Sequence, residues 1–199
     1  MWADVVVVTD RTTLNSLGTI VYDSNFSDFP SGFSFPGDPF TRGDVTYTSQ
    51  QNLIVGSGTS YSIGDSQTVM SNNYWTPLTG TISTSTNQYT LFGFDLAVTS
   101  GPVTVTVDTN DGSFVYPNLT VGNGDPNFTF EGFEAINGEY FTGFRIDTLG
   151  TGYLPGVTNV ALGIAGPSTV PEPSALPFAF AALALVILAS KLLRKHVQI

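Results

Sequence analysis

Two stretches in the second half of the chain place an apolar residue at every second position. Val103–Val107 reads Val-Thr-Val-Thr-Val, and Tyr89–Val98 repeats the same period with larger side chains. A period of two is typical of a β-strand with one face against a core, whereas an amphipathic helix has a period of 3.6 residues. We therefore expect two strands, with Thr104 and Thr106 pointing outward. The residues expected to point inward from Tyr89–Val98 are Phe92, Phe94, Leu96 and Val98.

Most of the chain before the C-terminal segment follows the same plan, since short apolar stretches alternate with turns rich in Gly, Pro, Asn and Asp. One short helix is expected, because Asp10 can cap it and Gly18 can end it. Residues 23–44 are predicted to form a long loop, and residues 56–74 are polar and rich in turn residues. The other predicted strands are Val5–Val8, Thr19–Tyr22, Val45–Gln50, Leu53–Val55, Leu78–Ser83, Ser113–Tyr116, Asn127–Phe133, Phe141–Thr148 and Val157–Ile164. This spacing predicts an all-β domain over residues 1–165, an antiparallel β-sandwich of jelly-roll-like topology.

The composition excludes several classes of function. The 199 residues include no Cys and a single histidine, His196. A disulfide framework, a thiolate nucleophile, a Cys-ligated zinc site and a Ser-His-Asp triad are therefore not expected. The net charge is −10, and only three basic residues precede position 174, so we expect no nucleic-acid partner.

The charge is divided between two parts of the chain. Residues 1–172 contain all sixteen acids and three arginines, a net charge of −13, whereas residues 173–199 contain three bases and no acid. Residues 175–193 form an almost uninterrupted apolar stretch that as a helix would span about 28 Å, close to the thickness of a bilayer core. We expect a transmembrane helix there and a basic cytoplasmic tail at residues 194–199; the alternative is a buried core helix. The basic cluster at the end of this stretch consists of Lys191, Arg194 and Lys195.

A linker over residues 166–174 joins the two parts and carries the motif Val170-Pro171-Glu172-Pro173. The two prolines disfavour helix and leave the Glu172 side chain displayed on an extended peptide. The order of this motif, the apolar helix and the basic cluster resembles the PEP-CTERM sorting signal of bacterial exported proteins. In that family an exosortase, a membrane enzyme, recognises the Pro-Glu-Pro segment, and the organisms make exopolysaccharide.

The resemblance implies a location for the protein. It implies anchoring in the inner membrane during export, with the N-terminal domain outside the cytoplasm, and a mature form at the cell surface or in the extracellular matrix. Members of the family usually begin with a secretory signal peptide. Residues 1–11 contain only a short apolar stretch between Asp4 and Asp10, so we expect the leader to lie upstream of this sequence.

A second resemblance lies in repeated Gly-Phe pairs over residues 92–160. They resemble the ectodomains that often precede PEP-CTERM tails, which are taken to be jelly rolls similar to carbohydrate-binding modules. The ligands of those ectodomains are mostly unknown, so this resemblance implies a fold and supplies no binding site. As a component of the envelope or extracellular matrix, the domain is expected to have exopolysaccharide as a partner. The segments that carry the resemblance are Phe92–Leu96, Phe130–Phe133, Phe141–Ile146 and Val157–Val160.

Two kinds of ligand site are candidates. Asp108, Asn110 and Asp111 offer oxygen ligands for Ca²⁺, although the Asp-Gly ending of the segment indicates a plain hairpin turn equally well. Tyr74 and Trp75 are candidates for stacking on a sugar ring, and the alternative is ordinary packing in a small sandwich. Further tyrosines near expected loops are Tyr47, Tyr61, Tyr116 and Tyr153.

Catalysis would have to come from carboxylates, as in a glycosidase. No pair stands in an apolar sequence setting that would raise one pKa, so we expect a protein without enzymatic activity. The alternatives are a single-pass membrane protein that is never processed and, less favoured, a carboxylate glycosidase. The acidic residues near expected turns or strand ends are Asp108, Asp111, Glu131, Glu134 and Glu139.

Overall fold

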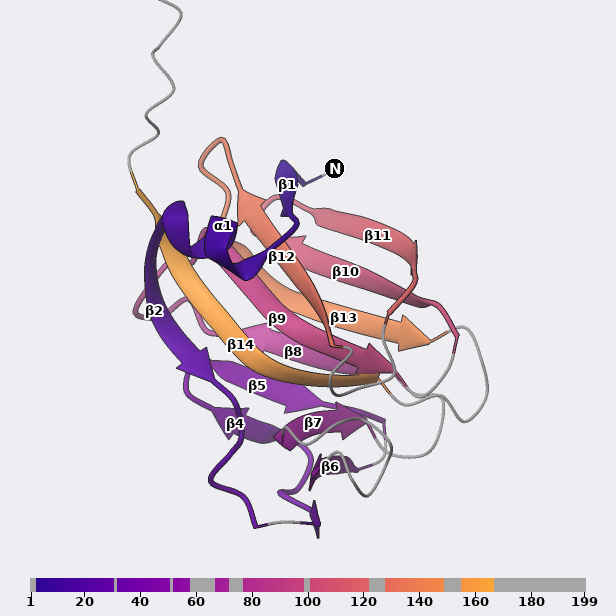
Figure 1. The fold of residues 1–199 in the computed structure, drawn as a ribbon. Helices are drawn as coiled ribbons and strands as arrows, with labels where there is room; N and C mark the ends of the chain where they lie inside the picture. Colours follow the sequence, from indigo (N-terminus) through magenta and orange to yellow (C-terminus); the bar gives the residue numbers. More distant parts are fainter. Residues whose placement is uncertain are drawn as a thin grey trace, which may run out of the picture. The chain divides into compact units, whose positions relative to one another are not determined.

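The computed structural model describes residues 3–30, 32–50, 52–57, 67–71, 77–98, 101–121, 128–148 and 155–166. Two antiparallel β-sheets pack face to face, and one short helix lies beside them (Figure 1). The prediction of an all-β antiparallel sandwich is therefore confirmed.

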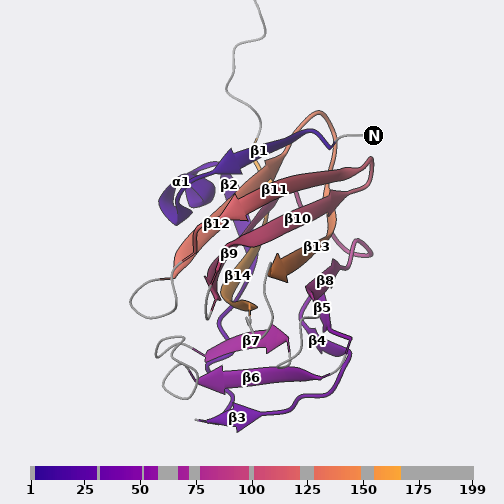
Figure 2. The same ribbon diagram turned by 90° about the vertical axis from the view of Figure 1, so that its right-hand side faces the viewer.

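Eight strands form the larger sheet. They are β1 (Val5–Val8), β2 (Gly18–Ser24), β3 (Phe33–Ser34), β6 (Leu53–Ser57), β7 (Gln67–Ser71), β9 (Leu91–Val98), β12 (Thr129–Ala135) and β14 (Pro155–Ala165). Their order is β1-β12-β9-β14-β7-β6-β3, and β2 pairs with part of β14. Figure 2 shows β3, β6 and β7 as three neighbouring strands at one end of the domain.

Six strands form the smaller sheet, in the order β11-β10-β13-β8-β5-β4. They are β4 (Phe40–Arg42), β5 (Val45–Thr48), β8 (Leu78–Ile82), β10 (Val103–Thr109), β11 (Ser113–Leu119) and β13 (Phe141–Thr148). Many neighbours are distant in sequence: β9 lies between β12 and β14, and β13 lies between β10 and β8. The order of strands is thus set by long-range pairing, as in other sandwiches with crossing connections.

Aromatic rings fill the space between the two sheets. The ring centroid of Phe92 lies 5.1 Å from that of Phe144 on the opposite sheet, and the centroid of Phe94 lies 5.7 Å from the same ring. Phe92, Phe94, Leu96 and Val98 all belong to this core, as the period of two predicts. Such ring pairs contribute beyond the area that they bury, since the edge of one ring favours the face of another.

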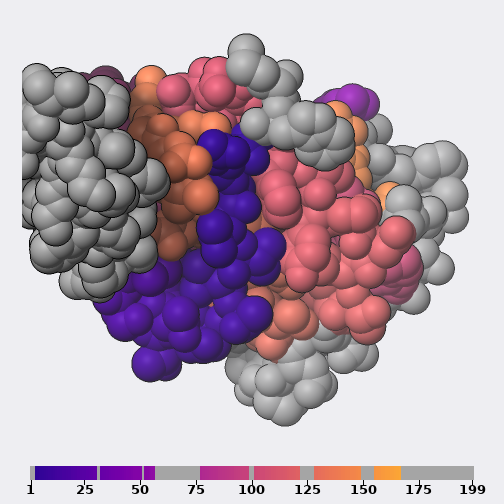
Figure 3. All heavy atoms as spheres, turned by 90° about the horizontal axis from the view of Figure 1, so that it is seen from above, coloured from indigo at the N-terminus to yellow at the C-terminus, as the bar shows by residue number. Residues whose placement is uncertain are grey.

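The outward face of the larger sheet carries a second, smaller core. Helix α1 (Arg11–Ser16) places Leu14 against Val8 and Leu91, which are all buried. Asp10 caps this helix, because its carboxylate accepts a hydrogen bond from the Thr13 N–H at 2.8 Å. In the space-filling view of Figure 3 the N-terminal segment forms a continuous band on the surface of the domain.

Gly18 does not end the helix as expected. Leu17 is the C-cap, in right-handed conformation, and Gly18 is the first residue of β2. A Cβ atom on Gly18 would lie 2.1 Å from the carbonyl oxygen of Ile164. The glycine is therefore needed for close approach of β2 to β14, and the helix ends without it.

Three strands lie in stretches predicted to lack them. β3 and β4 fall within residues 23–44, and β7 falls within residues 56–74. Strands of two or three residues are too short to show a period in the sequence. Their existence depends on partners elsewhere: β3 pairs with β6, β4 pairs with β5, and β7 pairs with both β6 and β14.

No helix among the described residues is long and apolar enough to cross a membrane. The predicted transmembrane helix at residues 175–193 and the basic tail at 194–199 lie outside the described residues.

Removal of the Phe94 side chain should be costly. Phe94→Ala leaves a cavity among the rings of Phe92, Phe133 and Phe144, so the free energy of unfolding should fall by about 3–5 kcal/mol. Equilibrium urea unfolding of the full chain, followed by far-UV circular dichroism, measures the change. Thr104→Ala on the half-exposed face of β10 is the control and should cost less than about 1 kcal/mol. Equal losses at the two positions would contradict the assignment of faces.

Candidate functional site

The longest strand, β14, changes partners along one of its edges. Gly156 and Val157 pair with β7, whereas the stretch from Val160 to Ala165 pairs with β2. Thr158 and Asn159 lie between these two ladders, and the pairing of β14 with β9 also shifts register there. We call this place the fork. Backbone groups at such a fork must find partners outside the regular ladder, because unpaired buried backbone groups are costly.

Asn159 has an irregular backbone at the fork. Its φ is +47°, a left-handed conformation that Asn tolerates better than most residues. Its carbonyl oxygen accepts a hydrogen bond from Arg11 Nη2 at 2.7 Å, and its Nδ2 donates to Asp95 Oδ2 at 2.6 Å. Arg11 also forms an ion pair with Asp95 at 3.0 Å. Side chains from α1 and β9 thus hold the fork residue on both its backbone and its amide.

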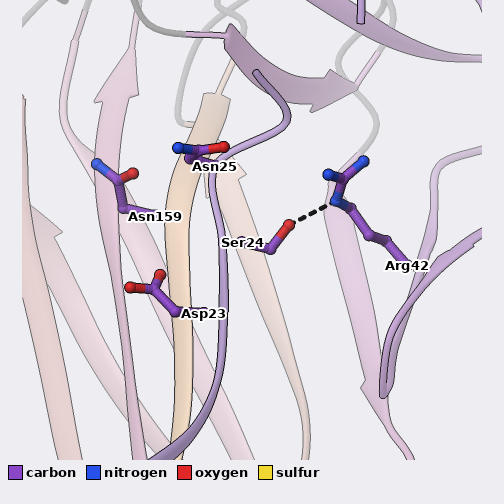
Figure 4. Close-up of a pocket in the computed structure, with 5 residues that line it drawn as sticks. All are labelled: Asp23, Ser24, Asn25, Arg42 and Asn159. Atoms are coloured by element: carbon purple, nitrogen blue, oxygen red, sulfur yellow. Dashed lines mark hydrogen bonds between the residues drawn. The ribbon is translucent and has the colours of Figure 1, made fainter. Parts of the chain in front are cut away.

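A polar hollow of about 230 Å³ opens beside the fork. Figure 4 shows the side chains of Asp23 and Asn159 on one side of the β2 chain, the hydrogen-bonded pair of Ser24 and Arg42 on the other, and Asn25 across the chain at its upper end. This separation follows from the alternation of side chains along an extended strand. The described residues that line the hollow are Asp23, Ser24, Asn25, Arg42 and Asn159.

The guanidinium of Arg42 is occupied by contacts within the protein. Nε donates to Ser24 Oγ at 2.5 Å, and Nη1 and Nη2 donate to the two carboxylate oxygens of Asp28 at 3.2 and 2.6 Å. These hydrogen bonds hold the pKa of Asp28 below its usual range. The charged group also lies 5.2 Å from the ring centroid of Phe26 and 5.8 Å from that of Phe29. Arg42 therefore anchors the segment that follows β2.

Asp23 and Asn25 present polar groups to solvent. Both residues are exposed, and no ion pair among the described residues involves Asp23. Asn25 Oδ1 accepts the Ser27 N–H at 3.1 Å, and the Asn25 carbonyl accepts from Thr158 Oγ1 at 3.2 Å. The hollow thus combines a carboxylate with amide groups of fixed position, which suits a ligand rich in hydroxyl groups.

The sequence prediction did not identify this site. Asp23, Ser24, Asn25 and Arg42 fall in the stretch predicted to be a loop, and Asn159 falls in the predicted strand Val157–Ile164. Two signals were present: a run of three polar residues directly after a strand, and the polar pair Thr158-Asn159 inside a mostly apolar strand. Neither signal shows that the two segments meet, since 133 positions separate Asn25 from Thr158.

The candidate calcium ligands lie in and beside the β10–β11 hairpin. Asn110 Oδ1 accepts the Tyr140 N–H at 2.9 Å, and Asp108 Oδ1 accepts from Ser113 Oγ at 2.5 Å. Asp111 is exposed. Two of the three side chains therefore already have partners that stabilise the hairpin. No group of three or more His, Cys, Asp or Glu side chains in the described part of the chain could hold a metal ion. Calcium binding stays a prediction.

The other predicted site residues lie outside the described residues. They are the sugar-stacking candidates Tyr74 and Trp75, the sorting motif Val170, Pro171, Glu172 and Pro173, and the basic cluster Lys191, Arg194 and Lys195.

The carboxylates considered for catalysis have different surroundings. Glu131 is 6 % exposed and shares the inward face of β12 with Phe133, and burial raises its pKa from 4.5 to about 7. The sequence did not indicate this apolar setting. Glu134 lies three positions along β12 and therefore emerges on the opposite face. Glu139 is occupied, since it accepts from the Asp4 N–H at 2.9 Å and from the Thr109 hydroxyl.

Comparisons with known proteins give a general likeness only. No protein-family model matches the chain, and no curated protein matches it. A solved family 29 carbohydrate-binding module is 14% identical, with 78% of this chain and 93% of that chain covered and a TM-score of 0.37. The CBM22-1 xylan-binding domain from Paenibacillus barcinonensis Xyn10C is 11% identical, with 76% and 97% covered and a TM-score of 0.40. At these TM-scores neither a family nor a ligand follows for this chain.

Burial of Glu131 should make stability depend on pH. Its pKa in the folded protein lies above the unfolded value, so its contribution is fully present below about pH 4.5 and is lost as pH rises through 7. Glu131→Gln cannot ionise. The variant should match the wild type near pH 4 and exceed it by up to about 3 kcal/mol at pH 8.5, as a shift of this size implies.

Urea unfolding of both proteins across this pH range measures the difference. Glu134→Gln, the same substitution on the opposite face of β12, is the matched control. A difference between wild type and Glu131→Gln that stays constant with pH would contradict the assignment.

Proposed function

We propose that the chain is a non-enzymatic protein of the cell surface or extracellular matrix that binds polysaccharide. The observation that carries this proposal is the polar hollow at the fork. Its lining offers a carboxylate and two amides beside the edge of a sheet, and these groups hydrogen-bond to sugar hydroxyls.

The same site favours binding over hydrolysis. A glycosidase needs two carboxyl groups that flank the scissile bond, one as acid and the other as nucleophile or base. Among the described residues that line the hollow, Asp23 alone carries a carboxylate. Glu131 has the raised pKa that suits an acid, but it points to the interior between the sheets, on the core face with Phe133.

The second part of the proposal concerns sorting. The motif Val170-Pro171-Glu172-Pro173, the apolar residues 175–193 and the basic cluster would direct the protein to an exosortase-type membrane enzyme. The bases Lys191, Arg194 and Lys195 at the end of the apolar stretch support retention of that end in the cytoplasm, which would leave residues 1–165 outside. The competing function is a permanently anchored single-pass protein with the same ectodomain.

We expect the protein to bind polysaccharide without hydrolysing it. The full chain, purified in mild detergent, should sediment with at least one insoluble polysaccharide and should release no reducing sugar from it over a day. Mannan, xylan, cellulose and the exopolysaccharide of an exosortase-bearing bacterium are suitable probes. Release of reducing ends above a heat-denatured control would contradict the non-enzymatic assignment and favour a glycosidase.

Glu172→Gln should block sorting without affecting the fold. The substitution preserves the prolines and removes one charge, so a subsite that recognises the carboxylate would lose its partner. In a host with an exosortase, the variant should accumulate in the membrane at full length, whereas the wild type is processed. Immunoblotting of membrane and extracellular fractions, with mass spectrometry of the mature C-terminus, measures this. Normal processing of Glu172→Gln would favour the permanently anchored alternative.

A further inference from the structure

We propose that the hollow at the fork binds a pair of adjacent hydroxyl groups on an uncharged sugar, with Asp23 as the acceptor and Asn25 as the donor. This inference rests on the proposed polysaccharide-binding function and specifies its site and the class of sugar. It follows from the hydrogen bonds that already occupy the lining residues.

Those bonds determine which groups of the two amides remain available. Asn25 Oδ1 is occupied by the Ser27 N–H at 3.1 Å, so its Nδ2 group is the part left to donate. Asn159 is oriented the opposite way, because its Nδ2 donates to Asp95 Oδ2 at 2.6 Å and leaves Oδ1 as an acceptor. The Asn25 amide therefore has its donor available, and the Asn159 amide has its acceptor available.

Asp23 completes the arrangement. Its carboxylate is exposed, lies on the same side of the β2 chain as Asn159 (Figure 4), and accepts hydrogen bonds only. Two neighbouring hydroxyl groups can both donate to one carboxylate, and either oxygen can accept in return from Asn25 Nδ2. A sugar hydroxyl is both a donor and an acceptor, so it can pair with the carboxylate and with the amide N–H. A ligand that only accepts or only donates would leave one of these two protein groups unpaired.

The charges of the site select against acidic sugars. Arg42 is the only cationic side chain among the described lining residues, and its charge is balanced by Asp28 through two hydrogen bonds. A uronate or sulfate group in the hollow would therefore meet Asp23 without an unpaired cation to compensate. The net charge of −13 on residues 1–172 adds a long-range repulsion of the same sign.

The site is held in shape before any ligand arrives. Arg11 Nη2 binds the Asn159 carbonyl at 2.7 Å, and Thr158 Oγ1 binds the Asn25 carbonyl at 3.2 Å. These contacts fix the two backbone segments that carry the amides. A rigid site loses less conformational entropy on binding than a mobile one, which favours specific recognition by few groups.

Isosteric substitutions test the assignment of donor and acceptor. Asp23→Asn removes the charge and one acceptor, and Asn25→Asp keeps the oxygen that binds Ser27 while it removes the donor. Asp4→Asn, just before β1, and Asn118→Asp, on β11, make the same two changes at exposed positions outside the hollow and are the matched controls.

The measurement is affinity electrophoresis of the full chain, in mild detergent, against soluble mannan, xylan, β-glucan and polygalacturonate. We expect wild type to bind at least one neutral polymer and not polygalacturonate. Asp23→Asn and Asn25→Asp should each weaken that binding by about tenfold or more, as loss of a hydrogen bond to a charged or buried partner does, and both controls should bind like wild type. Melting temperatures close to wild type establish that the variants are folded.

Two results would overturn the inference and leave the proposed function standing: binding of a neutral polymer that neither Asp23→Asn nor Asn25→Asp changes, or binding of polygalacturonate as tight as that of any neutral polymer. Absence of binding to every polymer would overturn the inference and the proposed function together.

Discussion

Strand β14 is the element on which the rest of the larger sheet depends. One of its edges pairs with β9. The opposite edge pairs with β7 near the start of β14 and with β2 near its end. One edge of a strand cannot pair with two partners at the same residues, so two residues of β14 are left unpaired between β7 and β2. Thr158 and Asn159 occupy that gap, and their polar groups turn to Asn25, Arg11 and Asp95. The hollow exists because the sheet changes partners there.

The parts of the fold that could be predicted are those determined by residues close together in the sequence. The inward set of β9 follows from a period of two, and the capping of α1 follows from Asp10 at the right distance from Thr13. β3, β4 and β7 could not be predicted from local pattern, because β3 and β4 have only two and three residues and β7 lies in a polar stretch rich in turn residues. The role of Gly18 was missed because the atom that it must avoid belongs to Ile164, far along the chain.

The candidate site was less predictable than the fold. The residues that stand out in the sequence are carboxylates, aromatic residues near turns and the oxygen ligands of the Asp108–Asp111 segment. Asn110 belongs to that segment, and its Oδ1 accepts a backbone N–H. Asn25 and Asn159 have the same residue type, but they lie beside the point where a ladder ends. What distinguishes them is the end of pairing between β2 and β14, which no local pattern encodes.

Arg11 gives the short helix a role beyond covering the outward face of the sheet. Its guanidinium lies 4.9 Å from the ring centroid of Phe130 and reaches the carbonyl of Asn159. Helix α1 and the left-handed residue at the fork are therefore linked, and such a linkage acts equally in both directions. A contact that fixes Asn159 therefore also stabilises the attachment of α1. Loss of the packing of α1 would in turn make Asn159, at the rim of the hollow, more mobile. The helix therefore supports the site through the hydrogen bond from Arg11 to Asn159, although none of the described lining residues belongs to the helix.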